Sequence, residues 1–242
     1  MTARVRADRL LVERGLFESR AKALAAIAAG LVWADDAQVR KPSDEIAADA
    51  ALRAEPAYPW VSRAGVKLAA ALDHFGFDPA SRICLDVGAS TGGFTHVLAE
   101  RGAARIYAVD VGTDQLHPSL RARENIVSLE RTDIRNLTAD RLGTAVDLVT
   151  VDVSFISLSL VLPPALALAG SPARLVALIK PQFEAGRQHL KKGIVRDKAI
   201  HDECCSAIAD IVRTLGWTVV GIIESPLPGG DGNREFLLAA ER

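Results

Sequence analysis

The sequence predicts an α/β protein in which a small α+β unit precedes a larger unit built on a mainly parallel sheet of seven strands. From about residue 82, short apolar runs alternate with helical segments, which is typical of strand–helix repetition. A glycine-rich turn at 88–93 directly follows the first apolar run. Open α/β sheets bind ligands at such turns, so the second observation also indicates a binding site.

The small unit is expected over residues 1–55. Two short helical patterns lie in "DRLLVERGLFESRAKALAAIAAGLV"; Gly15 separates them, Ser19 is placed to cap the second, and Gly30 is placed to end it. Short β-prone pieces follow, separated by a turn at Asp35-Asp36 and a second at Lys41-Pro42-Ser43.

A linker at 56–61, with Pro56 and Pro59, is expected to lead into the larger unit at 62–242. The stretch "WVSRAGVKLAAALDHF" reads as an amphipathic helix that carries Lys67 beside its apolar stripe. An isolated lysine of this kind is normally a solvated surface charge. The last of the seven strands is expected to run antiparallel.

Composition limits the functions that are possible. The net charge of −1 gives no whole-chain basicity, although residues 1–22 hold six basic against three acidic side chains. The three cysteines have neither the number nor the spacing of a disulfide framework or a metal site, which fits a reducing cytoplasm and no bound metal. Apolar runs such as 157–169 are too short to span a bilayer.

The turn in "DVGASTGGFT" permits three interpretations: a structural turn, a nicotinamide dinucleotide site, or an S-adenosylmethionine site. The G-x-G-x-x-G pattern is not met, because positions 88, 90 and 93 are Gly, Ser and Gly. No Gly-Lys-Ser/Thr follows, which excludes a P-loop. The string resembles the first motif of S-adenosylmethionine methyltransferases. That resemblance implies these cofactor-binding residues: Asp86, Gly88, Ser90, Thr91, Gly92, Gly93, Phe94, Asp110 at the ribose, and Asp133 with Ile134 at the adenine.

Four ionisable residues stand at the ends of predicted elements: Lys67, Asp152, Lys180 and Glu235. The carboxyl ends of parallel strands share one edge, and an antiparallel final strand begins there, so Asp152, Lys180 and Glu235 should lie on the same side of the sheet as the glycine-rich turn. Each alone has a structural explanation, such as a helix cap or a surface charge. Together they match the Lys-Asp-Lys-Glu order of ribose 2′-hydroxyl methyltransferases.

A ribose hydroxyl must lose or share its proton as it attacks a methyl group on a sulfonium. A lysine acts as a base only if burial or a second cation lowers its pKa. We expect Lys180 to contact the hydroxyl, Asp152 and Glu235 to orient the lysines, and Lys67 to supply charge near the ribose or phosphate. The Pro-Pro pattern of base-amine methyltransferases does not follow Asp152.

Several motifs, including "WVSRAGVKL", "DVSFISL", "LIKPQFE" and "GGDGNREF", resemble the TlyA family over nearly all of the chain. That resemblance implies an S4-like RNA-binding domain, an FtsJ-type Rossmann-like methyltransferase domain, and cytidine 2′-O-methylation of ribosomal RNA, in 23S rRNA for a chain of this shorter subtype. It also carries the older label of haemolysin. The chain departs from the S4 pattern at Ala34-Asp35-Asp36, where the family has valine-asparagine-glycine.

Basic residues in the S4-like unit, at the start of the larger unit and in the segment "KKGIVRD" are candidates for holding RNA phosphates. They are Arg6, Arg9, Arg20, Lys22, Lys41, Arg63, Lys191 and Lys192. A ribosomal RNA or a ribosomal subunit is therefore the expected partner, and the oligomeric state is open. Rival hypotheses are a haemolysin, a non-catalytic RNA-binding factor and a small-molecule methyltransferase.

Overall fold

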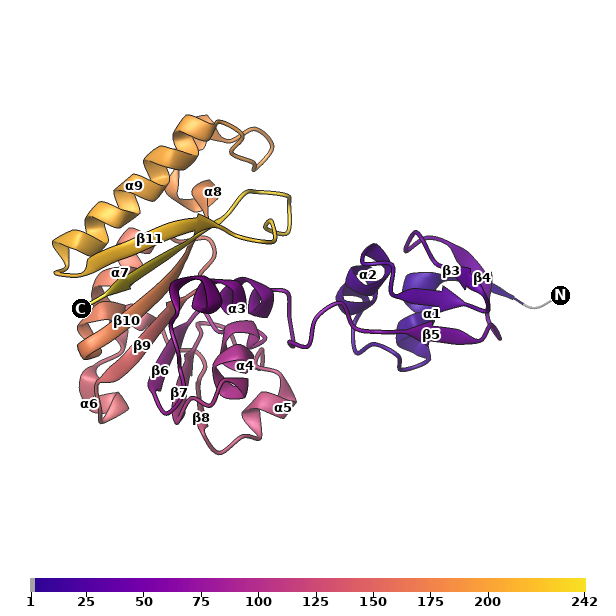
Figure 1. Ribbon diagram of the computed structural model, residues 1–242, viewed down its shortest axis with the longest axis horizontal. Coiled ribbons are helices and arrows are strands. Elements are labelled where there is room, and N and C mark those ends of the chain that lie inside the picture. Colours follow the sequence, from indigo (N-terminus) through magenta and orange to yellow (C-terminus); the bar gives the residue numbers. More distant parts are fainter. Residues whose placement is uncertain (1–2) are drawn as a thin grey trace. The chain divides into compact units, whose positions relative to one another are not determined.

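A computed structural model describes residues 3–242, and the chain divides into two compact units, one up to Pro59 and one over Trp60–Arg242. Both are drawn in Figure 1, where colour follows the sequence. Each unit has its own apolar core.

The first unit packs two helices, α1 (Ala7–Glu13) and α2 (Arg20–Ala28), with two small sheets. The Ser19 side chain accepts a hydrogen bond from Lys22 N at 3.3 Å, so α2 begins at the predicted cap. One sheet has the order β3-β2-β5, and the other pairs β1 with β4. The bounds are β1 Arg4–Arg6, β2 Val32–Ala34, β3 Ala37–Gln38, β4 Glu45–Ala47 and β5 Leu52–Ala54. Strands β1 and β4 were not predicted.

The second unit holds a seven-stranded sheet of order β11-β12-β10-β9-β6-β7-β8. Neighbours from β10 to β8 are parallel, and β12 runs antiparallel to both β10 and β11. The bounds are β6 Ile83–Val87, β7 Arg105–Val109, β8 Ile126–Leu129, β9 Val146–Val151, β10 Ala169–Ile179, β11 Thr218–Glu224 and β12 Phe236–Glu241. The predicted α/β unit with a mainly parallel sheet of seven strands and the antiparallel last strand are confirmed.

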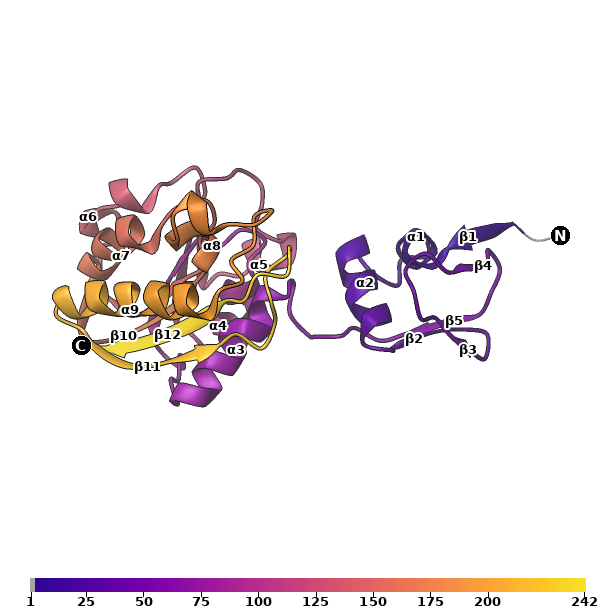
Figure 2. The same cartoon turned by 90° about the horizontal axis from the view of Figure 1, so that it is seen from above.

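Helices cover both faces of this sheet, because its central strands are apolar on both sides. Leu85 and Val87 of β6 join the core cluster that holds α7 and α9, whereas Cys84 joins the cluster that holds α3 and α4. Figure 2 shows this layering. The helices are α3 Ala64–Phe75, α4 Gly93–Glu100, α5 Pro118–Arg121, α6 Ala139–Leu142, α7 Leu158–Ala167, α8 Pro181–Glu184 and α9 Lys198–Thr214, with short 3-10 turns at Ile134–Asn136 and Arg187–His189.

The strand order reverses at β6, with β7 on one side and β9 on the other. This switch point leaves a crevice beyond the carboxyl ends of the strands. Strand β12 starts at the same edge, since Phe236 pairs with Ile179 at the end of β10. Over residues 3–242, no helix has the length and apolar character needed to cross a membrane.

Candidate active site

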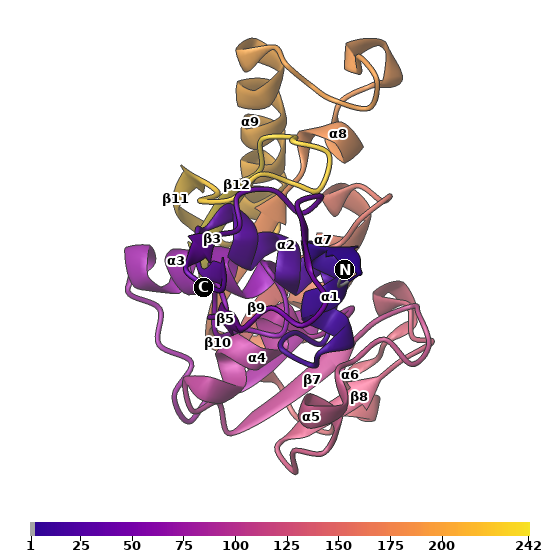
Figure 3. The ribbon, with the colours of Figure 1, turned by 90° about the vertical axis from the view of Figure 1, so that its right-hand side faces the viewer.

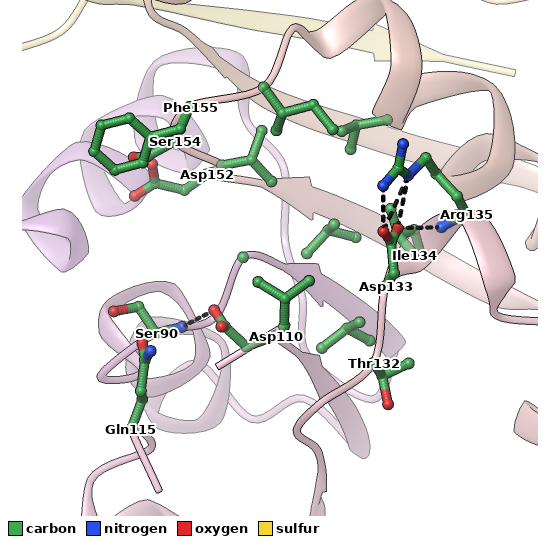
Figure 4. A pocket seen from close by; sticks show the side chains of 17 residues that line it. Ser90, Asp110, Gln115, Thr132, Asp133, Ile134, Arg135, Asp152, Ser154 and Phe155 are labelled. Carbon is green, nitrogen blue, oxygen red and sulfur yellow. Dashed lines mark hydrogen bonds and ion pairs between the residues drawn. The ribbon is translucent and has the colours of Figure 1, made fainter. Parts of the chain in front are cut away.

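A cavity of about 480 Å³ lies beyond the carboxyl ends of β6, β7 and β9 (Figure 4). Its apolar walls include Val87, Val111 and Ile134, and its polar lining includes Asp110 and Asp133. A smaller cavity of about 170 Å³ adjoins it, and Gly88, Ser90, Asp152 and Ser154 line both. The site therefore has a large compartment and a small one that share a wall.

Gly88 allows this wall to form. Its φ is +83°, and a Cβ at this position would overlap the main-chain carbonyl of Asp152. Only glycine combines this left-handed conformation with so close an approach of two strand ends. Gly93 is similarly confined, because a Cβ there would overlap the hydroxyl of Ser62.

Asp110 follows β7 and holds the glycine-rich turn. Its Oδ2 accepts a hydrogen bond from Ser90 N at 2.8 Å, and its Oδ1 accepts one from Gly112 N at 2.7 Å. A carboxylate has about four acceptor positions, so the side chain can still accept hydrogen bonds from a diol. Figure 4 shows Asp110 beside Ser90 in the cavity.

Asp133 and Ile134 lie at the far wall of the large cavity. Arg135 engages both oxygens of Asp133, with Nε at 3.0 Å from each and Nη2 at 2.6 Å from Oδ2. These hydrogen bonds hold the pKa of Asp133 below its usual range. An adenine contact through this carboxylate would have to be shared with Arg135.

Asp86 does not line either cavity, contrary to the expectation that it binds the cofactor directly. It is fully buried, and it accepts hydrogen bonds from Thr95 Oγ1 at 2.6 Å and Thr150 Oγ1 at 3.0 Å. Burial raises the pKa of Asp86 to about 7. The residue ties β6 to α4 and β9 beneath the turn, so its effect on a ligand is indirect.

The remaining residues of the glycine-rich turn differ in whether they line a cavity. Thr91, Gly93 and Phe94 line the small cavity. Gly92 lines neither, and a Cβ there would overlap Leu120 of α5. The absence of a side chain at position 92 therefore allows α5 to pack against the turn, and it does not serve the approach of a ligand.

Two lysine–carboxylate pairs stand at this edge of the sheet. Lys67 of α3 pairs with Glu235, which directly precedes β12, and both side chains are buried. Lys180, which follows β10, lies 2.7 Å from Asp152 Oδ1 and donates to Ser154 Oγ at 2.9 Å. The pairing of Ile179 with Phe236 sets Lys180 and Glu235 next to each other. The structure thus brings all four predicted residues to one edge.

Comparison with known proteins agrees with this geometry. The profile of the FtsJ-like methyltransferase family matches residues 60–242. The 16S/23S rRNA (cytidine-2′-O)-methyltransferase TlyA of Mycobacterium tuberculosis is 45% identical over 241 residues, which cover 98% of this chain and 90% of that protein. The chain belongs to the TlyA family of FtsJ-like methyltransferases.

Two further proteins that resemble this chain carry a different name. Hemolysin A of Brachyspira hyodysenteriae is 36% identical over 235 residues, 96% of this chain and 98% of that one. A solved structure from Streptococcus thermophilus, also named a hemolysin, is 38% identical, with a TM-score of 0.78 over 100% of this chain and 90% of that one.

In this TlyA family member, four of the five predicted RNA-binding cations of the first unit are held by carboxylates. Arg6 Nε and Arg20 Nη2 lie 3.1 and 2.5 Å from the buried Asp8. Arg9 pairs with Glu13, and Lys22 pairs with Glu18, each at 2.7 Å. RNA phosphates would compete with these partners. The other predicted cations, Lys41, Arg63, Lys191 and Lys192, are exposed.

Sequence reasoning missed several lining residues. Ser154 contacts Lys180 and lines both cavities, and its only sequence signal is its place two residues after Asp152. Gln115, Thr132 and Arg135 line the large cavity from loops whose course the sequence pattern does not define.

Proposed function

We propose that the chain transfers a methyl group from S-adenosylmethionine to the ribose 2′-hydroxyl of a cytidine in ribosomal RNA, and specifically in 23S rRNA. The observation that carries the proposal is the pair of lysine–carboxylate contacts, Lys67 with Glu235 and Lys180 with Asp152, beside the cavity. The name of the Mycobacterium tuberculosis relative supports the choice of cytidine and of ribosomal RNA.

The residues of the large cavity fit S-adenosylmethionine. Gly88 lets the chain approach a ligand closely, Asp110 can accept hydrogen bonds from a ribose diol, and Val111 with Ile134 offers apolar surface to a purine ring. When bound, the cofactor supplies an electrophilic methyl group on a positively charged sulfur. The small cavity, which Lys180 lines, would receive the ribose.

The role of Lys180 follows from its contacts. Asp152 and Ser154 fix Nζ at the wall shared by the two cavities, so it can contact a hydroxyl oxygen there. In its uncharged form, Nζ would take the proton that the 2′-oxygen gives up as that oxygen bonds to the methyl carbon, a step for which a positioned base contributes roughly 10²- to 10⁴-fold in rate. Glu235 and Asp152 orient the two lysines, and Lys67 adds positive charge where the oxygen becomes negative.

We also propose that residues 1–55 form an S4-like RNA-binding domain. Its exposed cations would fix the register on RNA through phosphates, without reading sequence. Because Arg6 and Arg20 bracket the buried Asp8, they are held in one geometry, which lowers the entropy lost on binding a phosphate.

The test is methyl transfer from S-adenosylmethionine, tritiated in the methyl group, to purified large and small ribosomal subunits and to the free RNAs. We expect label in 23S rRNA, and small-subunit label would extend the substrate to 16S rRNA. Red-cell lysis assayed in parallel tests the haemolysin alternative. Absence of label from every ribosomal RNA would refute the proposal.

A further inference from the structure

The loop between α8 and α9 presents the lysine pair of the larger unit. Lys191 and Ile194 exchange two main-chain hydrogen bonds, at 3.0 and 3.1 Å, which closes a tight turn. Lys192 and Gly193 occupy this turn with φ values of +54° and +78°. The turn exposes Lys191 and Lys192 while the following Val195 is buried.

A single buried amide, Asn233, fastens this loop to the turn that precedes β12. Its Oδ1 accepts a hydrogen bond from Val195 N at 3.1 Å, and its Nδ2 donates to the carbonyl of Gly193 at 3.0 Å. Asn233 is 2% exposed, so each bond would be costly to leave unmade. Figure 3 shows the two loops next to each other, in orange and yellow.

The same loop is held from a second side by α9. His201 is buried, and its Nε2 lies 3.0 Å from the carbonyl of Val195. Both main-chain groups of Val195 are therefore occupied, one by Asn233 and one by His201. Hydrogen bonds from two sides thus hold the main chain of the loop at Val195.

Asn233 also belongs to the turn that presents Glu235. Its carbonyl accepts a hydrogen bond from Gly229 N at 2.9 Å, and the carbonyl of Glu235 accepts one from Ser225 N at 2.8 Å. A Cβ on Gly229 would lie 2.6 Å from Glu235 Oε1, so the turn packs directly against the carboxylate that pairs with Lys67.

We propose that Asn233 is a positioning residue that couples the lysine turn, 191–194, to the Glu235–Lys67 pair. The inference rests on the proposed function and adds a means by which RNA contact at the lysines aligns the reacting edge. A phosphate held by Lys191 or Lys192 fixes the turn, the amide of Asn233 transmits that position to the segment 229–235, and Glu235 then sets Lys67.

The test is a double-mutant cycle of four full-length proteins: the unmodified chain, Lys191→Ala with Lys192→Ala, Asn233→Ala, and all three changes together. Affinity for the large ribosomal subunit is measured over a series of KCl concentrations. In the unmodified chain, removal of the two lysines should reduce the slope of log affinity against log salt by about 2. With Asn233→Ala present, the same removal should change the slope by less than half as much.

Single-turnover methyl transfer at saturating subunit supplies the second readout. Asn233→Ala should lower the rate roughly tenfold or more while affinity for S-adenosylmethionine changes less than about twofold, since Asn233 lines neither cavity. The lysine variant should lose affinity for the subunit and should also show a lower rate at saturating subunit, because no phosphate then fixes the turn that Asn233 links to Glu235. Asn125→Ala is the matched control. It removes a side-chain amide hydrogen bond of similar length, from Asn125 Nδ2 to the carbonyl of Ala103 at 3.0 Å, at a position away from the site.

Equal slope changes in the two backgrounds, or an unchanged rate for Asn233→Ala, would overturn the proposal. If Asn233→Ala does not fold, Asn233→Ser is used, whose hydroxyl can still meet one of the two partners. The affinity cycle does not depend on methyl transfer. A chain that binds subunits but transfers no methyl would therefore defeat the proposed function while the cycle still decides the coupling.

Discussion

Lys67 and Glu235 form a buried ion pair although 168 residues separate them in the sequence. The side chains are 10% and 3% exposed, so neither charge is solvated well enough to stand alone. The pair joins α3, near the start of the larger unit, to the turn before its last strand. The attraction between the two charges thus holds α3 against this turn and also sets the position of Lys67 for the proposed chemistry.

Breaking this pair should destabilise the larger unit strongly. Glu235→Ala leaves the Lys67 ammonium buried without its partner, and such changes cost about 3–5 kcal/mol in the free energy of unfolding. The double variant Lys67→Met with Glu235→Leu should be more stable than Glu235→Ala alone, while both lose methyl transfer. Urea unfolding monitored by circular dichroism measures the difference. A double variant that is less stable than Glu235→Ala would contradict this account.

Gly88→Ala should reduce both stability and cofactor affinity. The new methyl group would overlap the carbonyl of Asp152 and would also force a left-handed conformation on alanine. Gly143→Ala is the matched control, since Gly143 has a φ of +71° and a Cβ added there would meet nothing within 4 Å, and it should cost only about 1–2 kcal/mol. Calorimetric titration with S-adenosylmethionine should show weaker binding for Gly88→Ala only. Equal binding by both variants would argue against Gly88 as part of the cofactor wall.

Asp86 should make stability fall as pH rises. Its pKa is raised to about 7 in the folded chain from 3.8, so between these values the folded state holds a proton that the unfolded state has released. The stabilisation is complete below about pH 4 and is lost as pH rises through 7. Asp86→Asn removes this titration while its amide can still pair with Thr95 and Thr150. Urea unfolding of both proteins at several pH values measures the difference in unfolding free energy, variant minus unmodified chain, and this difference should grow from pH 5 to pH 8. If the unfolding free energies of the two proteins instead change with pH in parallel, Asp86 does not titrate in this range.

Asp110→Ala should weaken binding of S-adenosylmethionine by roughly 10- to 100-fold, about 1.4–2.7 kcal/mol. The change removes the expected diol acceptor and also frees Ser90 N and Gly112 N, so the glycine-rich turn loses its anchor. Asp140→Ala, at an exposed position on α6, serves as the control. Fluorescence or calorimetric titration measures both constants, and unchanged affinity in Asp110→Ala would remove this residue from the site.

The larger unit follows closely from the sequence because its signals are local. Continuous apolar runs separated by helical segments indicate buried parallel strands, and the parallel arrangement then places Asp152 and Lys180 at one edge. The burial of Lys67 could not be read from its own segment. It depends on Glu235, whose position is set only when β12 pairs with β10.

Other features lay beyond sequence reasoning for different reasons. Strands β1 and β4 have three residues each, too few for an alternating pattern to appear. The motif suggested that Asp86 reaches the cofactor, but the pleat of β6 directs its side chain to Thr95 and Thr150. The ion pair of Arg20 with Asp8 joins the first residue of α2 to the first turn of α1, so it arises from the packing of the two helices, which charge counting cannot show.

The most direct test of the central claim maps the methyl group in ribosomal RNA after reaction with the unmodified chain and with Lys180→Ala. Alkaline hydrolysis cleaves RNA only where a free 2′-hydroxyl is present, so a 2′-O-methylated cytidine survives in an alkali-resistant dinucleotide. We predict labelled dinucleotide from 23S rRNA with the unmodified chain, and none with a Lys180→Ala protein that folds and binds S-adenosylmethionine. Label released as alkali-labile mononucleotide, or equal label from Lys180→Ala, would contradict the account.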